Sequence, residues 1–205
     1  MLCRPFVLAG EKMNQIKSLY QELRKKHGKP EGQWKLWCKR PKTKSEREEV
    51  IIGAILTQRT NWRNVELSIS NLKKAGACSL AKISKLGARK LRPLVRPSGF
   101  YKTKADYLLG AAKFFARKPK RIKRGDLLGL KGVGKETADS ILLYALDKPI
   151  FVIDEYTRRL VKEKGLAKDL SYDHLQKLFE ENLSKKWRLY QDFHALIVID
   201  AKNKK

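Results

Sequence analysis

Long apolar runs, disulfide patterns and metal-ligand clusters are all missing from this sequence. No stretch reaches the roughly 18 apolar residues that span a bilayer, so no transmembrane helix is expected. The briefly apolar start, MLCRPFVLAGEK, is too short and too soon interrupted for a secretion signal. Cys3, Cys38 and Cys78 lie far apart and fit neither a disulfide framework nor a metal site, and His174 and His194 have no second ligand at a suitable spacing. These absences favour a reducing intracellular compartment.

Acidic residues are scarce. The 205 residues include 47 Lys and Arg against 21 Asp and Glu, which gives a formal net charge of +26. Such a charge favours a polyanionic partner, usually nucleic acid, although a ribosomal or chromatin protein or merely a basic surface is the alternative. The charge is spread along the chain, and 42% hydrophobic residues predict a folded protein rather than a basic tail. The length suits one domain or two small, packed ones.

Alternating strand patterns and internal repeats are also missing, so the fold is predicted to be nearly all helix. The first helix is expected over residues 11–26, where one apolar face carries Met13, Ile16, Leu19, Tyr20 and Leu23. After a loop over 28–44, Ser45 and Glu48 predict a capping box that opens an apolar helix over 50–57. The remaining helices are predicted near 61–74, 79–85, 88–95, 101–116, 126–130, 155–164, 171–184 and 187–201, with a turn at 96–99.

The stretch from Leu130 to Asp154 is the most informative part of the chain. Gly132 and Gly134 allow a tight turn and a close approach of the backbone to a large ligand. A helix is predicted directly afterwards, because apolar residues recur at helical spacing in Ala138, Ile141, Leu142 and Ala145. The first N–H groups of such a helix suit a phosphate. The sequence therefore places the Asp154 carboxylate just beyond an element that can grip nucleic acid.

Five segments, in the same order, resemble the helix-hairpin-helix DNA glycosylase superfamily, which includes endonuclease III. The hairpin LKGVGKETA resembles the family's L-P-G-V-G-x-K-T-A, and Asp154 stands where the family keeps its catalytic aspartate. The other three segments are LTQRTNW at 56–62, VRPSGFYKTKA at 95–105 and FHALIVIDAK at 193–202.

The resemblance covers residues 45–202 and implies a particular architecture. It implies an all-α fold of two helical lobes with the active site in the cleft between them. One lobe is expected at 45–148, with the helix-hairpin-helix motif at 126–146, and the other at 1–44 plus 149–205.

Two departures from the family pattern narrow the expected activity. Bifunctional members carry a lysine nucleophile where this chain has Glu136, and a glutamate cannot form the Schiff base that lyase chemistry needs. Lys135 lies one residue earlier, about 100° around the helix, and should point elsewhere. The four clustered cysteines that hold an iron–sulfur cluster in endonuclease III are also missing. With GKETAD, RPSGFY and Lys202, these departures most resemble the 3-methyladenine DNA glycosylase III branch.

The resemblance also assigns roles to individual residues. Asp154 is the implied catalytic carboxylate, and an N-cap of the helix that begins at Glu155 is the compatible structural alternative. Gln58 matches the side chain that fills the hole left by a flipped nucleotide, or else it caps a helix end or is solvated. Phe100 matches the wedge that enters the opposite strand, with core packing as the alternative.

The resemblance implies that aromatic and charged side chains line the pocket for the base. Trp62 matches a pocket aromatic of the branch, and Trp34 or Trp37 could supply a second stacking surface, although ordinary core packing is the alternative for each. Glu136 could face a cationic base or be a solvated residue of a first helical turn. Lys202 matches a pocket-side lysine or is a frayed terminal residue.

The hairpin is the implied DNA contact. Its amide groups, at Gly132 and Gly134, are expected to hold phosphates together with Lys131 and Lys135. The family resemblance also implies a monovalent cation on the hairpin carbonyls and no iron–sulfur cluster.

The expected function is that of a monofunctional DNA glycosylase that removes alkylated purines such as 3-methyladenine by hydrolysis. A bifunctional endonuclease III-like glycosylase/AP lyase and a non-catalytic helix-hairpin-helix DNA-binding protein are the alternatives. Double-stranded DNA is the expected partner, with no membrane, and the chain is expected to act as a monomer in the cytoplasm, on DNA.

Overall fold

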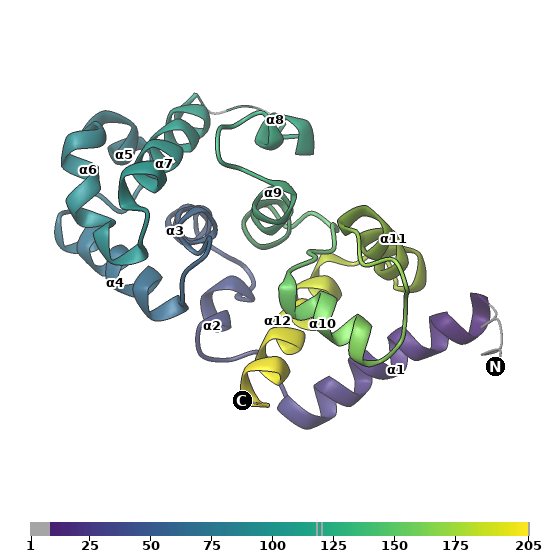
Figure 1. Ribbon diagram of the computed structural model, residues 1–205. Coiled ribbons are helices and arrows are strands. Elements are labelled where there is room, and N and C mark those ends of the chain that lie inside the picture. Colours follow the sequence, from purple (N-terminus) through teal and green to yellow (C-terminus); the bar gives the residue numbers. More distant parts are fainter. Residues whose placement is uncertain (1–8, 118, 120, 205) are drawn as a thin grey trace. The chain divides into compact units, whose positions relative to one another are not determined.

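The computed structural model describes residues 9–117, 119 and 121–204, with side chains from residue 15 onward, so Cys3 and the Met13 side chain lie outside it. The predicted all-helical fold is confirmed, since the described residues contain no strand (Figure 1). Among these residues, no helix combines the length and apolarity that crossing a bilayer requires. The chain divides into two compact units, Lys39–Leu146 and the described residues on either side of it.

The discontinuous unit joins the two ends of the chain. It contains α1 (Ala9–His27), α2 (Trp34–Trp37), α10 (Glu155–Glu163), α11 (Tyr172–Asn182) and α12 (Trp187–Asn203). Helix α12 packs against α1 and α10, and α1 also packs against α11 (Figure 1). An aromatic cluster fills the core, where the rings of Phe151 and Phe179 stack with centroids 4.3 Å apart and both lie near Phe193.

The Lys39–Leu146 unit is built around α3 (Lys44–Leu56). All residues from Val50 to Leu56 are buried, which is typical of a helix surrounded on every side. Helix α3 contacts α4 (Trp62–Lys74), α7 (Tyr101–Ala116), α9 (Lys135–Ser140) and the π-helical η2 (Ile141–Ala145). The unit is completed by α5 (Leu80–Leu86), α6 (Ala88–Leu94), the 3₁₀ turn η1 (Arg96–Ser98) and α8 (Arg124–Leu128).

Two local predictions were wrong. The capping box of α3 is Thr43 with Glu46, because Glu46 N–H donates to Thr43 Oγ1 and Thr43 N–H donates to Glu46 Oε2. The predicted box at Ser45 has the same spacing, but Glu48 instead accepts a hydrogen bond from the Leu80 N–H. The segment 28–44 is also not entirely loop, since it contains the single turn α2.

The helix-hairpin-helix motif is held by a partly buried ion pair and by one glycine. Arg124 of α8 donates through Nε and Nη2 to the two carboxylate oxygens of Asp139 on α9, at 2.7 and 2.8 Å. Gly132 has φ +79°, and a Cβ there would lie 2.1 Å from the Tyr107 ring of α7. Gly134 has an ordinary φ of −85° and open space around it. The fold of this unit therefore requires glycine at position 132 but not at position 134.

Gly132→Ala and Gly134→Ala form a matched pair that tests this difference. Gly132→Ala should lower the free energy of unfolding by about 2–4 kcal/mol, because it adds left-handed strain to a clash with Tyr107. Gly134→Ala should cost less than about 1 kcal/mol, the penalty of alanine at an N-cap. Urea denaturation followed by circular dichroism measures both, and equal losses would contradict the assigned role of Tyr107.

Candidate active site and nucleic-acid interface

Asp154 is the N-cap of α10, as the structural alternative expected. Its Oδ1 accepts hydrogen bonds from Thr157 N–H at 2.8 Å and from Thr157 Oγ1 at 2.9 Å. Both bonds use one carboxylate oxygen, and the side chain is 13% exposed. The cap therefore fixes the orientation of the carboxylate while Oδ2 takes no part in it.

His194 of α12 is a partner of Asp154 that the sequence prediction missed. Its Nε2 lies 3.4 Å from Asp154 Oδ2, and its side chain is 5% exposed. Burial raises the pKa of the Asp154 carboxyl, but the charge and hydrogen bonding of His194 and the bonds from Thr157 outweigh burial and hold this pKa below its usual value. Asp154 is therefore an anion at neutral pH. No spacing rule could find this pair, because its members lie 40 residues apart on different helices.

A pair of tryptophans lies next to the same histidine, with Trp34 in contact with it. Trp34 and Trp37 of α2 have ring centroids 5.7 Å apart in an edge-to-face arrangement, and the Trp34 ring meets His194 edge-on at 5.7 Å. Both tryptophans are only 6% exposed, in agreement with the core-packing alternative. The aromatic pair is thus connected to Asp154 through His194.

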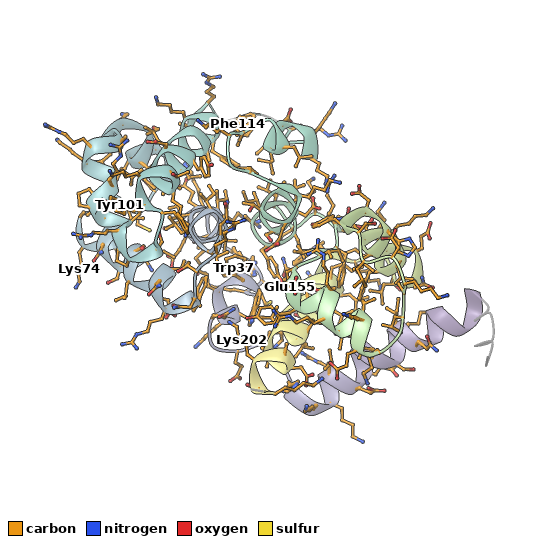
Figure 2. The ribbon with its side chains drawn as sticks, in the orientation of Figure 1. Trp37, Lys74, Tyr101, Phe114, Glu155 and Lys202 are labelled. Carbon is orange, nitrogen blue, oxygen red and sulfur yellow. The ribbon has the colours of Figure 1, made fainter. Side chains whose placement is uncertain are left out.

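Lys202 belongs to the last turns of α12, within the described helix (Figure 2). Its Nζ donates to Gln33 Oε1 at 2.9 Å, next to the start of α2. Burial lowers the pKa of Lys202, and the negative charge of Asp154 partly opposes this effect. Lys202 is therefore part of an ordered helix rather than a frayed end. It is fixed by its hydrogen bond to Gln33 and lies within electrostatic range of Asp154.

All of the predicted DNA-contact residues lie in the Lys39–Leu146 unit. Lys131, Gly134, Lys135 and Glu136 are exposed. Gln58 is partly buried, and its Nε2 donates to Gly132 O at 3.0 Å and to Thr137 Oγ1 at 3.3 Å rather than to a helix end. The segment after α3 is thereby attached to the hairpin.

Phe100 is not a core residue. It is 68% exposed, and its φ of 44° is the left-handed conformation that non-glycine residues rarely adopt. The preceding Gly99 also has a positive φ, of 69°. An exposed aromatic on a strained turn is a feature that folding alone does not require.

Trp62 and Lys104 complete the description of this unit. Trp62 begins α4 and is partly buried, which leaves both alternatives for it open. Lys104 of α7 is only 3% exposed, and burial lowers its pKa to about 8. Across the described residues, no group of three or more His, Cys, Asp or Glu side chains is arranged to hold a metal ion.

Comparisons with known proteins identify the family of this chain. The family model described as "HhH-GPD superfamily base excision DNA repair protein" matches residues 52–185. A relative from Methanocaldococcus jannaschii, provisionally named DNA repair glycosylase MJ1434, is 44% identical over 169 residues, which are 76% of this chain and 77% of that protein. Endonuclease III of Thermotoga maritima is 28% identical over 143 residues, 65% of this chain and 66% of the enzyme.

Solved structures give the same result. The H. pylori 3-methyladenine DNA glycosylase MagIII, bound to 1,N6-ethenoadenine, matches with a TM-score of 0.78 and 31% identity, covering 95% of this chain and 98% of that one. A non-covalent endonuclease III–DNA complex matches in fold with a TM-score of 0.74 at 18% identity, covering 91% and 84%. The chain therefore belongs to the HhH-GPD superfamily of base excision DNA repair proteins, and to its DNA glycosylases.

Proposed function

We propose that this chain is a monofunctional DNA glycosylase that removes alkylated purines, such as 3-methyladenine, by hydrolysing the N-glycosidic bond. The observation that carries the proposal is the Asp154 carboxylate, held as an anion by Thr157 and His194 at the start of α10. The similarity to a 3-methyladenine glycosylase at 31% identity over 95% of the chain supports the substrate class.

Asp154 would stabilise the reaction through its charge. As the base leaves with the electrons of the N-glycosidic bond, the sugar gains oxocarbenium-like positive charge, which a nearby carboxylate stabilises. Because Oδ1 is committed to Thr157, Oδ2 is the oxygen assigned to the sugar or to the attacking water. His194 beside Oδ2 would keep the carboxylate ionised.

A cationic alkylated base is already a good leaving group, so its selection depends on stacking rather than on strong acid catalysis. Trp62, Trp34 and Trp37 are the proposed aromatic surfaces. Trp34 and Trp37 are each only 6% exposed. A base could therefore stack on either ring only if DNA binding uncovered part of it. Glu136, exposed on α9, and Lys202, which senses the charge of Asp154, are the charged groups proposed to interact with the base.

Double-stranded DNA is the proposed partner of the Lys39–Leu146 unit. The formal charge of +26 suits a phosphate backbone, and the exposed Lys131, Gly134 and Lys135 are proposed to contact it. Phe100, at 68% exposed, is the proposed wedge between stacked bases, and Gln58 is proposed to fill the vacated position.

A monovalent cation at the hairpin is compatible with these contacts. Leu130 O accepts from Val133 N–H at 3.0 Å, and Gly132 O accepts from Gln58 at 3.0 Å. Each carbonyl oxygen retains a second lone pair for an ion. Such an ion would add positive charge beside the DNA phosphates.

A bifunctional glycosylase/AP lyase is the second candidate function. The observation in its favour is the exposed Lys135, which directly precedes Glu136 on the first turn of α9. The similarity to endonuclease III points the same way.

Asp154→Asn tests the central residue, because asparagine keeps the cap oxygen but removes the charge. We expect base release from alkylated double-stranded DNA to fall at least about 100-fold, as for other groups that stabilise transition-state charge. Chromatography of the released bases under single-turnover conditions gives the rate and also identifies the preferred base. Release at the native rate would remove Asp154 from its role.

His194→Gln tests how the carboxylate is kept ionised. In the native protein the Asp154 pKa lies below its ordinary value, so activity should show no loss from Asp154 protonation above about pH 4. Without His194, the largest of the effects that lower this pKa is lost, so the pKa should rise and the acidic limb of the rate profile should move to higher pH. An unchanged limb in the folded variant, measured between pH 4 and 8, would contradict the pairing.

Borohydride trapping separates the two candidate activities. A monofunctional enzyme forms no Schiff base, so native protein and Lys135→Met should both give no covalent DNA adduct with sodium borohydride. Endonuclease III serves as the positive control on the same abasic DNA. An adduct that forms with the native protein and disappears in Lys135→Met would establish the lyase instead.

A further inference from the structure

Lys104 is a buried lysine without an acidic partner. It is 3% exposed, although lysine is almost never fully buried unless it is paired. Its Nζ donates to two main-chain carbonyls, Leu56 O at 2.9 Å and Ser98 O at 2.5 Å. Burying an ammonium group is costly, and these two hydrogen bonds offset part of that cost.

Each of the two carbonyls ends a helical element, two residues before a residue proposed to enter DNA. Leu56 ends α3 and precedes Gln58 by two residues, while Ser98 ends η1 and precedes Phe100 by two residues. The Leu56 carbonyl also lies at the negative end of the α3 dipole, where a cation is favourable. One ammonium group therefore connects two segments. One carries Gln58, the proposed plug of the vacated position, and the other carries Phe100, the proposed wedge.

The wedge turn needs such support. Gly99 and Phe100 both have positive φ values, and the exposed Phe100 ring cannot stabilise the turn by packing. Strained backbone persists only where surrounding contacts fix it. Ser98 Oγ donates to Val95 O at 2.7 Å, and Lys104 N–H donates to Phe100 O at 2.9 Å, so Lys104 contacts the turn from both its backbone and its side chain.

The connection extends to the hairpin. Gln58 reaches from the α3 segment to Gly132 O and Thr137 Oγ1, and Tyr107, one helical turn beyond Lys104 on α7, packs against Gly132. The Gln58 segment, the Phe100 turn and the hairpin are all proposed to meet DNA. They are thus joined through one face of α7.

We propose that Lys104 is a positioning residue that fixes the Phe100 turn to the Gln58 segment, so that wedge and plug enter DNA as one preorganised unit. This inference rests on the proposed glycosylase function. Preorganisation lowers the ordering cost that binding and base extrusion would otherwise meet. Loss of the Nζ bonds should therefore affect the reaction through Phe100 rather than by loss of positive charge.

The test is a double-mutant cycle of Lys104→Met with Phe100→Ala, in the full chain, with Lys113→Met as the matched control. Lys113 is an exposed lysine of the same helix, so its substitution removes the same charge. Single-turnover base release from alkylated duplex DNA is measured at 25 °C, with circular dichroism to confirm folding. 2-Aminopurine opposite the lesion reports unstacking by the wedge.

Lys104→Met should lower the rate about 10-fold in the native background and less than 2-fold in the Phe100→Ala background, because residues that act together are not additive. The 2-aminopurine signal should be lost in Lys104→Met and kept in Lys113→Met. If Lys104→Met does not fold, the same cycle with Lys104→Gln should show the same non-additivity.

Equal effects of the Lys104 substitution in both backgrounds, or an unchanged 2-aminopurine signal, would overturn the role of Lys104 while native base release upholds the proposed function. Absence of base release from the native chain on every alkylated substrate would instead overturn the proposed function, and the assigned role with it.

Discussion

Satisfying the free backbone groups at helix ends is the constraint on which this structure depends. A fold made of short helices leaves many N–H and C=O groups without intrahelical partners. Side chains satisfy some of these groups, as Thr43 does for α3, Asn61 for α4 and Asp154 for α10. Lys104 does the same at the C-terminal end of α3. Asp154 is both such a cap and the proposed catalytic carboxylate, so at α10 capping and the proposed function use the same side chain.

Buried charge is the second recurring feature of a chain whose surface is strongly basic. Several charged groups of the described residues have little solvent exposure, and three of them are satisfied in different ways. Asp139 receives a bidentate arginine, Asp154 receives His194 and Thr157, and Lys104 receives two carbonyl oxygens. Because desolvated charges are costly, these contacts hold the hairpin, the candidate active site and the wedge turn in defined geometries. The exposed lysines can then attract phosphate without determining the fold.

Local pattern predicted the helices well and the pairings poorly. The bounds of α7 at Tyr101–Ala116 follow directly from the turn before it and the apolar periodicity within it. The α3 cap was misplaced by two residues because two overlapping sequences have the capping-box spacing, and only packing near Leu80 decides that Glu48 serves elsewhere. The one-turn helix α2 was missed because four residues carry too little periodicity. The resemblance to the glycosylase family supplied Asp154 and Phe100, and His194 had no sequence signal.

By itself, the sequence determined the all-helical class, the basic surface, the position of the hairpin and the carboxylate beyond it. These properties depend on composition, turn residues and spacing along the chain, which are local. Only the tertiary structure decided that His194 lies against Asp154, that Gln58 bonds the hairpin and that Lys104 joins two turns. Those contacts join residues 40, 74 and 48 positions apart. Such partners are chosen by how buried polar groups are satisfied in three dimensions, which no pattern along the chain records.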